Sequence, residues 1–213
     1  MLTRMLCLAN SIRENGRCVA GIDIDTGEWI RPVPQSCGCI PAFRTMVKGE
    51  QLAVLDVVKI ELNEDSLETN FQCENRVILD WNWKLIDRFK PKDVIGYCDN
   101  TAPILYCTGD RVDPIIFNSL SPGEWKSLQL VKPQNLNFYR DDFNRRRWRA
   151  HFNDINDNGY YLKITDPVIS SRLNIDETIN SNSLLTISLA QPWSPDNNTP
   201  ERCYKLVAAI IEL

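Results

Sequence analysis

Short runs of β-type residues separated by turn residues constrain the fold of this chain more than any other feature. The runs 4–9, 17–24 and 28–33 are rich in apolar residues, and Asp25, Thr26 and Gly27 lie between the last two. Such spacing predicts a meander of short strands. Further strand-like runs at 52–62 and 71–79 extend the pattern, so the first part of the chain is predicted to be mainly β.

One short helix is predicted in this first part. Trp81, Leu85, Ile86 and Phe89 follow the spacing of one helical face, and Pro91 would end the helix. We therefore expect a helix near 82–89, and a loop-rich stretch at 90–112 that separates two domains, 1–95 and 96–213.

The second domain repeats the style of the first. Its strand-like runs are 127–131, 135–140, 146–152, 160–164, 184–189 and 204–213. A helical segment running to Leu173 is expected after Asp166-Pro167. Two sets of about five short strands, each with one small helix, predict a mainly β protein of two tandem, small OB-like β-barrels with a few short helices.

Positive charge is concentrated in one segment of an otherwise acidic chain. Residues 126–151 hold seven Lys or Arg and two Asp, a local net charge of +5, while the whole chain carries −4. Aromatic residues interleave with these arginines from Phe138 to Phe152. Arginines pair with phosphates and aromatic rings stack on bases, so the segment indicates nucleic-acid binding. A solvated arginine-rich strand is the alternative.

Strand alternation sorts the residues of this segment onto two faces. It predicts Arg147, Arg149 and His151 on an exposed face. Trp148, Ala150 and Phe152 are expected in the core. We predict that Tyr139 stacks on a base beside the cations, and that the binding residues of this segment are Tyr139, Arg140, Arg145, Arg147 and Arg149.

The first domain offers a second candidate surface. Arg17 lies beside the first hairpin turn, and Arg31 alternates with Trp29 along the third strand. A face that mixes Trp29 and Arg31 could stack a base or hold a phosphate, extending the track. Pairing of Arg31 with Asp23 or Glu28 on a neighbouring strand is the alternative.

Signals for catalysis or metal binding are weak. The eight cysteines form no C-x-x-C pair, so Cys37 and Cys39 are the only nucleus for a metal site, and His151 is the single histidine. No nucleophile elbow occurs. We predict no enzyme activity, no metal and no cofactor. The chain shows no signal peptide or membrane-spanning run, and a cytoplasmic location with reduced cysteines is expected.

Several motifs carry a resemblance to a known family. The opening CLANSIRENGRCVAGID and GEWIRPV, the run LDVVKIEL, the central RRRWRAHF, and the ending LLTISLAQPW with CYKLVAAIIEL resemble the dual OB domain family of prokaryotic proteins. The resemblance spans nearly the whole chain and implies two OB-type barrels in tandem. It also implies the role proposed for that family, nucleic-acid binding as an accessory or sensor in prokaryotic defence or mobile-element conflict.

The basic segment and the resemblance to the dual OB domain family together predict a protein that binds single-stranded nucleic acid or RNA. Two other functions remain open. The chain could be an interaction module that docks on a partner protein from a defence system, such as an enzyme, or a sensor of a small anionic nucleotide ligand.

Overall fold

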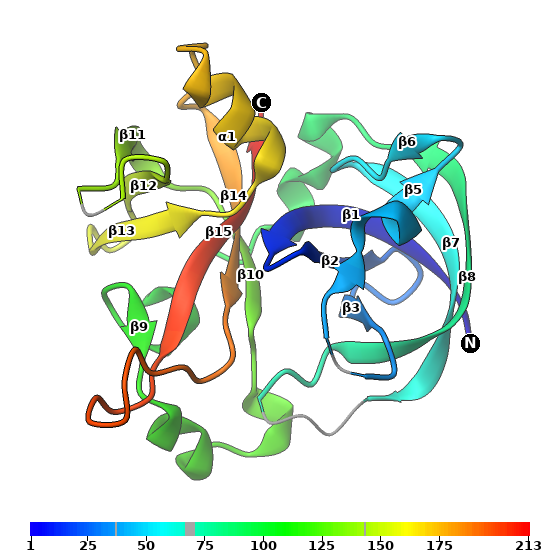
Figure 1. The fold of residues 1–213 in the computed structure, drawn as a ribbon, viewed down its shortest axis with the longest axis horizontal. Helices are drawn as coiled ribbons and strands as arrows, with labels where there is room; N and C mark the ends of the chain where they lie inside the picture. The colour runs from blue at the N-terminus through cyan, green and yellow to red at the C-terminus, as the bar shows by residue number, and fades with distance from the viewer. Residues whose placement is uncertain (37, 67–70, 143) are drawn as a thin grey trace. The chain divides into compact units, whose positions relative to one another are not determined.

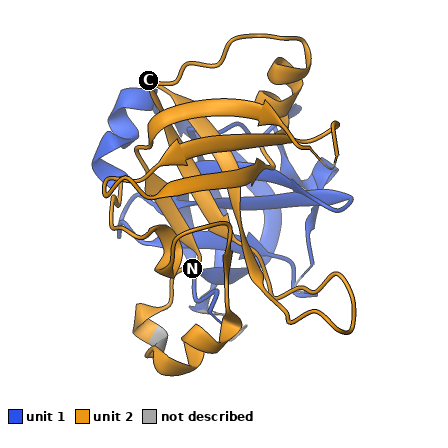
Figure 2. Cartoon of the chain, turned by 90° about the vertical axis from the view of Figure 1, so that its left-hand side faces the viewer, with its two compact units in different colours: residues 1–97 blue, residues 98–213 orange. Residues whose placement is uncertain are grey.

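The structure is a computed structural model that describes residues 1–36, 38–66, 71–142 and 144–213. It divides into two compact units, residues 1–97 and 98–213, shown in different colours in Figure 2. This division lies close to the predicted boundary after residue 95. Both units consist mainly of β-strands, as predicted.

Unit 1 is a five-stranded barrel with short additional strands and 3₁₀ turns. Its elements are β1 (Leu2–Arg13), β2 (Gly16–Asp23), β3 (Trp29–Val33), β4 (Ile40–Pro41), η1 (Ala42–Thr45), β5 (Met46–Val47), β6 (Glu50–Gln51), β7 (Asp56–Ser66), β8 (Asn75–Arg88) and η2 (Pro91–Tyr97). The strand order β1–β7–β8–β3–β2 returns to β1, which closes the barrel (Figure 1). The β3–β8 contact is parallel, and the other contacts within this ring are antiparallel.

The first strand closes the barrel because it is long enough to pair with two other strands. Its beginning pairs with β7, from Leu2 to Leu6, and its remainder pairs with β2. A shift of register between Cys7 and Ala9 marks a β-bulge in this strand. Bulges bend a strand and increase its twist, which is what a small barrel requires.

The predicted helix near 82–89 is wrong, because these residues belong to β8. Trp81, Trp83 and Leu85 alternate along the strand toward the core of unit 1, and Leu85 pairs with Val58 of β7. Register shifts between β7 and β8 accompany this pairing. The apolar spacing that resembled a helical face therefore comes from a bulged strand, in which cross-strand pairing decides the structure.

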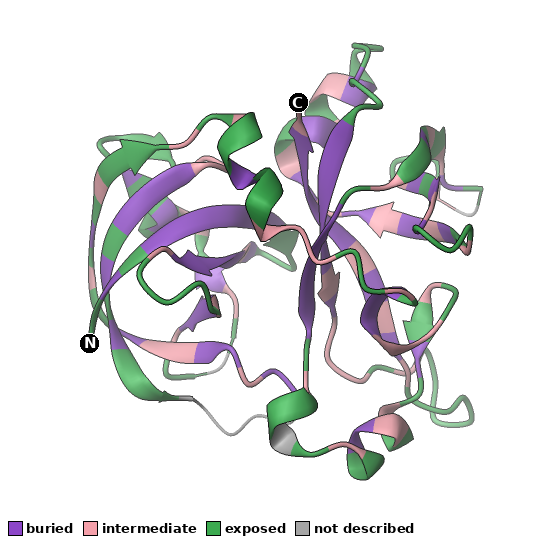
Figure 3. Cartoon of the chain, turned by 180° about the vertical axis from the view of Figure 1, so that it is seen from behind, coloured by how far each residue is buried: buried purple, intermediate pink, exposed green. Residues whose placement is uncertain are grey.

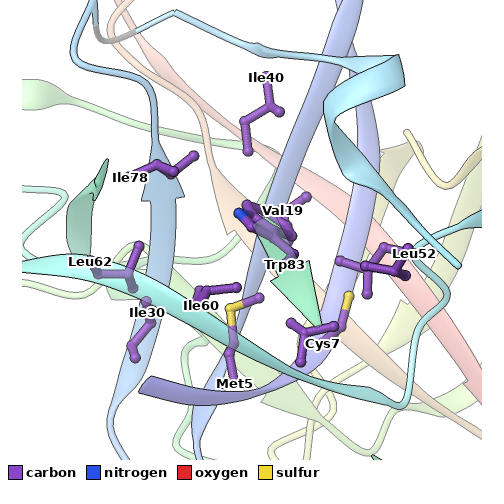
Figure 4. Close-up of a cluster of buried hydrophobic side chains, with 12 residues drawn as sticks. Met5, Cys7, Val19, Ile30, Ile40, Leu52, Ile60, Leu62, Ile78 and Trp83 are labelled. Atoms are coloured by element: carbon purple, nitrogen blue, oxygen red, sulfur yellow. The ribbon is translucent and has the colours of Figure 1, made fainter. Parts of the chain in front are cut away.

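The barrel of unit 1 is filled by aliphatic side chains around one tryptophan. Figure 4 shows residues from several strands converging, with the Trp83 indole close to Val19. Met5, Cys7 and Val58 are fully buried. Each aliphatic side chain that is fully buried contributes about 1.5–3 kcal/mol of transfer free energy, so this cluster is the main stabilising element of the unit.

Unit 2 has the same strand order with one interruption. Its elements are η3 (Ile104–Tyr106), β9 (Arg111–Val112), η4 (Pro114–Ser119), η5 (Pro122–Glu124), β10 (Leu128–Val131), β11 (Gln134–Arg140), β12 (Trp148–Asn153), β13 (Gly159–Ile164), α1 (Pro167–Asn174), β14 (Ser183–Leu189) and β15 (Cys203–Glu212). The sheet runs β10–β14–β15–β13–β12–β11, with a parallel β13–β15 contact.

The end strands of this sheet, β10 and β11, are consecutive in the chain and separated only by Lys132 and Pro133. Together they correspond to β1 of unit 1. β10 pairs with β14, the fourth strand of the barrel, and β11 pairs with β12, the second strand. Proline has no N–H to donate to a ladder, which explains the break at Pro133. Unit 2 is therefore an OB-like barrel with a broken first strand.

Helix α1 connects the third and fourth strands of this barrel, where the sequence predicted it. The Asp166 carboxylate accepts hydrogen bonds from the backbone N–H groups of Val168 (2.9 Å) and Ile169 (3.2 Å), and Pro167 occupies the first turn. Asp166 also accepts from the N–H of Ile210, at 3.1 Å, which ties the start of the helix to β15.

Candidate nucleic-acid interface

Strands β11, β12 and β13 present one polar, aromatic face in unit 2. Their antiparallel register places Tyr139 opposite Arg149, His151 opposite Tyr161, and Arg149 opposite Lys163. The alternate residues of β12, Ala150 and Phe152, are fully buried. The predicted alternation along β12 is thus observed for these residues. We call the outer residues Tyr139, Arg147, Arg149, His151, Tyr161 and Lys163 the strand face.

Three rings form a triangle at the centre of the strand face. The ring centroids of Tyr139 and His151 are 6.3 Å apart, and the Tyr161 ring lies 6.4 Å from each of them. The rings meet at steep angles, so none of them covers the face of another completely. Tyr139 is 49% exposed. A planar base can therefore stack on this ring without any rearrangement of the core.

Cationic side chains adjoin the triangle. The Arg149 guanidinium lies 5.1 Å from the Tyr161 ring centroid and donates to the Tyr161 carbonyl (3.2 Å) and to the Asp141 carboxylate (2.6 Å). Burial lowers the pKa of Lys163, and the neighbouring charges of Arg147 and Arg149 lower it further. Arg147 and Lys163 thus present positive charge beside Arg149, whose own charge is paired with Asp141, and this excess favours an anion at this position.

The turn between β11 and β12 displays three exposed positive charges, Arg147 of the strand face and two more. The Asp141 carboxylate accepts from the N–H of Asn144 at 2.9 Å, and the N–H of Asp141 donates to the Arg147 carbonyl at 2.9 Å. These bonds hold the described part of the turn, so that Arg145, Arg146 and Arg147 extend from it. No acidic partner of these three side chains occurs among the residues that the structure describes.

Two predictions for this segment need correction. Arg140 lies over the Trp148 ring, with its guanidinium carbon 4.1 Å from the ring centroid, on the face opposite Tyr139. Both side chains donate to the Asn174 side-chain oxygen, at 2.9 and 3.0 Å. Arg140 therefore fastens the hairpin to the end of α1. Trp148, predicted to lie in the core, is only half-buried.

Arg31 is not on an accessible surface, contrary to the prediction. It is 6% exposed and forms an ion pair with Glu74 at 2.9 Å, and Glu74 is 5% exposed. The parallel register of β3 and β8 places Arg31 opposite Asn75, whose side-chain oxygen lies 3.4 Å from its guanidinium. The carboxylate that pairs with Arg31 here belongs to Glu74, directly before β8, and not to the predicted alternatives Asp23 or Glu28.

Arg17 lies at one end of the unit 1 barrel. Its register partners are Ile12 and Ile40, and its side chain is half-buried. One guanidinium nitrogen, Nη1, is buried and finds no partner among the described residues. Arg17 and Arg31 therefore do not share a face in unit 1, whereas Tyr139, Arg147 and Arg149 come together in unit 2.

Sequence reasoning missed part of the strand face. Tyr161 and Lys163 were read only as members of a strand, and His151 was placed on the exposed face without a role. The alternation Tyr160, Tyr161, Leu162, Lys163 carried the signal, since Tyr160 and Leu162 are buried and their neighbours are not. The register that places Tyr161 beside His151 is a long-range property and could not be predicted locally.

A second aromatic cluster in unit 2 surrounds the start of β15. The Trp193 ring, in the connection between β14 and β15, lies 5.9 Å from the Tyr204 ring, and the Arg111 guanidinium carbon lies 5.4 Å from the same ring. Arg111 pairs with Asp110 at 2.8 Å. The positive charge of this cluster is thus partly neutralised, as the charge of Arg149 on the strand face is by Asp141.

Among the described residues, no group of three or more His, Cys, Asp or Glu could hold a metal ion. Cys37, half of the predicted metal nucleus, lies outside the described residues, and Cys39 is half-buried with a free thiol. No helix in the described part of the chain is both long and apolar enough to cross a membrane.

The strand order and the helix after the third strand define a protein with two OB-type barrels. In OB folds, the face of strands two and three and the adjoining loops bind oligonucleotides and oligosaccharides. A family model described as "dual OB-containing domain" matches residues 3–210. The chain therefore belongs to the dual OB-containing domain family, as its motifs suggested. No curated protein sequence matches it.

Proposed function

We propose that this protein binds single-stranded nucleic acid or RNA on the strand face of unit 2. The observation that carries the proposal is the triangle of the exposed Tyr139 and His151 with the half-buried Tyr161, and Arg147, Arg149 and Lys163 lie beside it. Rings supply stacking, worth about 1–3 kcal/mol per base, and the cations supply phosphate neutralisation.

Single strands suit this face better than duplex. A base can stack on Tyr139 only when its own face is free, which a paired and stacked base in a duplex does not allow. The net charge of −4 also opposes avid binding to a long duplex, because the acidic remainder of the chain repels phosphates. Arg145, Arg146 and Arg147 then act as flexible phosphate contacts next to a fixed stacking site.

The proposal describes a binding protein rather than an enzyme. Arg149 and Asp141 hold each other, and neither is placed as a general acid or base. We infer an accessory role in which the protein presents or senses a strand for a partner, in line with the defence role that its family suggests. Isolation of a tagged chain from its native cell tests this part, since the expected result is co-purification of both nucleic acid and a partner protein.

Fluorescence anisotropy tests the binding itself. Labelled single-stranded RNA, single-stranded DNA and duplex are titrated at two salt concentrations. We expect salt-sensitive binding that prefers single strands. Tyr139→Ala should weaken it about 5- to 150-fold, the equivalent of one lost stack. Arg145→Ala with Arg147→Ala should reduce the salt slope by about 1.4, or about 0.7 for each phosphate contact.

Lys59→Ala is the matched control, because Lys59 is an exposed cation on β7 of unit 1. It should change neither the affinity nor the salt slope. A wild-type protein that binds no strand at low salt would refute the proposal. A thermal shift with mononucleotides alone would then favour the sensor function.

A further inference from the structure

We propose a second nucleic-acid contact on unit 1, formed by Phe43 and Arg44 of η1 with Trp81 of β8. This inference rests on the proposed function, since the ligand is the same single strand. It assigns a role to an aromatic and cationic cluster outside the strand face. Its members come from the connection between the third and fourth strands and from the fifth strand.

The geometry is that of a cation held between two rings. The Arg44 guanidinium carbon lies 5.4 Å from the centroid of the Phe43 ring and 5.5 Å from that of the Trp81 ring. Trp81 packs against the core of unit 1, which fixes one side of this arrangement. Phe43 is 67% exposed. A large ring left this open has most of a face available for stacking.

The charge around η1 is positive where it meets the first hairpin. Gly16 pairs with both Arg13 and Pro41, and this places the end of the hairpin beside the start of η1. Neither Arg13 nor Arg44 has an acidic partner among the described residues. Arg13 at the end of the hairpin adds a second positive charge beside η1, and Arg44 is the cation that the structure places against the exposed Phe43 ring.

The chemistry fits a nucleotide better than a protein partner. Docking of a protein requires a patch of roughly 800 Å² on each side with an apolar centre. Here one exposed phenylalanine lies beside one arginine without an acidic partner in the described part of the chain, which matches one base and its phosphate. The arrangement repeats, with different residues, the combination of ring and free arginine found on the strand face.

The usual OB surface is closed in unit 1, which explains why a contact would lie elsewhere. Along β2, Ala20 and Ile22 alternate with the core residue Val19, and they are only 4% and 2% exposed. Figure 3 shows long strands of unit 1 largely in the colour of buried residues, whereas Phe43 and Arg44 of η1 are exposed. The face of the second strand therefore cannot receive a base, and the end of the barrel near η1 can.

Strand length separates the two contacts experimentally. A strand of about 6 nucleotides fills at most one OB-type site, whereas about 30 nucleotides can occupy two. Anisotropy is measured for both lengths with the wild type, Phe43→Ala, Arg44→Ala and Tyr139→Ala. Ile95→Ala is the matched control for Phe43, because it removes another exposed apolar side chain of unit 1 (42% exposed).

The expected result is length-dependent. Phe43→Ala and Arg44→Ala should each weaken binding of the long strand about five- to tenfold. The affinity for the short strand should change by less than about twofold, because a second site adds to the affinity only when one strand reaches both sites. Tyr139→Ala should weaken binding of both. Photo-crosslinking of a long strand that contains 4-thiouridine should mark the peptide that carries Phe43.

Other outcomes overturn the inference in recognisable ways. Unchanged affinity for the long strand in both unit 1 variants, with loss in Tyr139→Ala, would remove the second contact and leave the proposed function intact. Failure of the wild type to bind either strand would remove both. Equal loss for the short and the long strand in Phe43→Ala would also contradict a separate second site.

Discussion

The buried Arg31–Glu74 ion pair should dominate the response of unit 1 to a single substitution. Its two side chains are 7% and 5% exposed, with 2.9 Å between guanidinium nitrogen and carboxylate oxygen. The pair links β3 to the start of β8, where Arg31 also lies 3.4 Å from the Asn75 oxygen. Replacing Glu74 by Gln removes the charge that compensates the guanidinium and keeps nearly the same shape.

The expected loss of stability follows from the free-energy cost of a buried charge without a partner. Arginine stays protonated at any accessible pH, so it cannot neutralise itself when its partner is lost. Breaking such a pair costs about 3–5 kcal/mol, whereas the total stability of a domain is about 5–15 kcal/mol. Glu74→Gln should therefore destabilise the protein by about 3 kcal/mol or more. Arg31→Met combined with Glu74→Leu should recover most of this loss, because an apolar pair leaves no charge behind.

Guanidinium unfolding, followed by tryptophan fluorescence and far-ultraviolet circular dichroism, measures the free energy of unfolding of each variant. Glu61→Gln is the control, since Glu61 is an exposed glutamate on β7, and it should change stability by less than about 0.5 kcal/mol. The reasoning is refuted if Glu74→Gln loses less than about 1 kcal/mol, or if the double variant is less stable than either single variant.

Two further predictions concern unit 2. Trp148→Ala should lower the free energy of unfolding by about 1–3 kcal/mol, because a half-buried ring that bonds to Asn174 at 3.0 Å is lost. Its affinity for single strands should stay unchanged. Reduced affinity at unchanged stability would contradict the structural role of Trp148. Burial lowers the pKa of Lys205 below its ordinary value of 10.5, so between the two values the unfolded chain binds more protons and stability should rise with pH. Burial raises the pKa of the Cys203 thiol, which acts in the opposite direction in both proteins, so the test is the difference in stability between the wild type and Lys205→Met. This difference should shift in favour of the wild type from pH 7 to pH 10, and a constant difference would contradict the assignment.

The strands and the helix α1 could be predicted because local signals and tertiary structure agree there. Asp166-Pro167 caps the helix as its sequence indicates, and the β-branched runs pair as strands. Residues 82–89 show the opposite case. Their apolar spacing has the period of a helix only because bulges shift the register of β8 against β7, and a bulge depends on the partner strand.

The residues of the candidate site could be predicted only where the alternation of side chains along one strand determines which face they occupy. Alternation along β12 indicated Arg149 and His151, but the rings that complete the triangle come from strands on either side. Arg140 and Arg31 were misplaced for a related reason. Their partners, Trp148 and Glu74, are brought close by pairing across the sheet, and a single sequence contains charge and spacing but not register.

The two barrels show how one topology gives different surfaces. The second strand of unit 1 carries Ala20 and Ile22 outward, where they are buried, while the second strand of unit 2 carries Arg149 and His151 at the corresponding face. Strand order alone therefore does not decide which barrel can bind a strand. The side chains at alternate positions decide it, and they favour unit 2 for the main interface. Among the described residues of unit 1, η1 combines an exposed ring with an arginine that has no acidic partner, which is why substitutions there should matter for long strands alone.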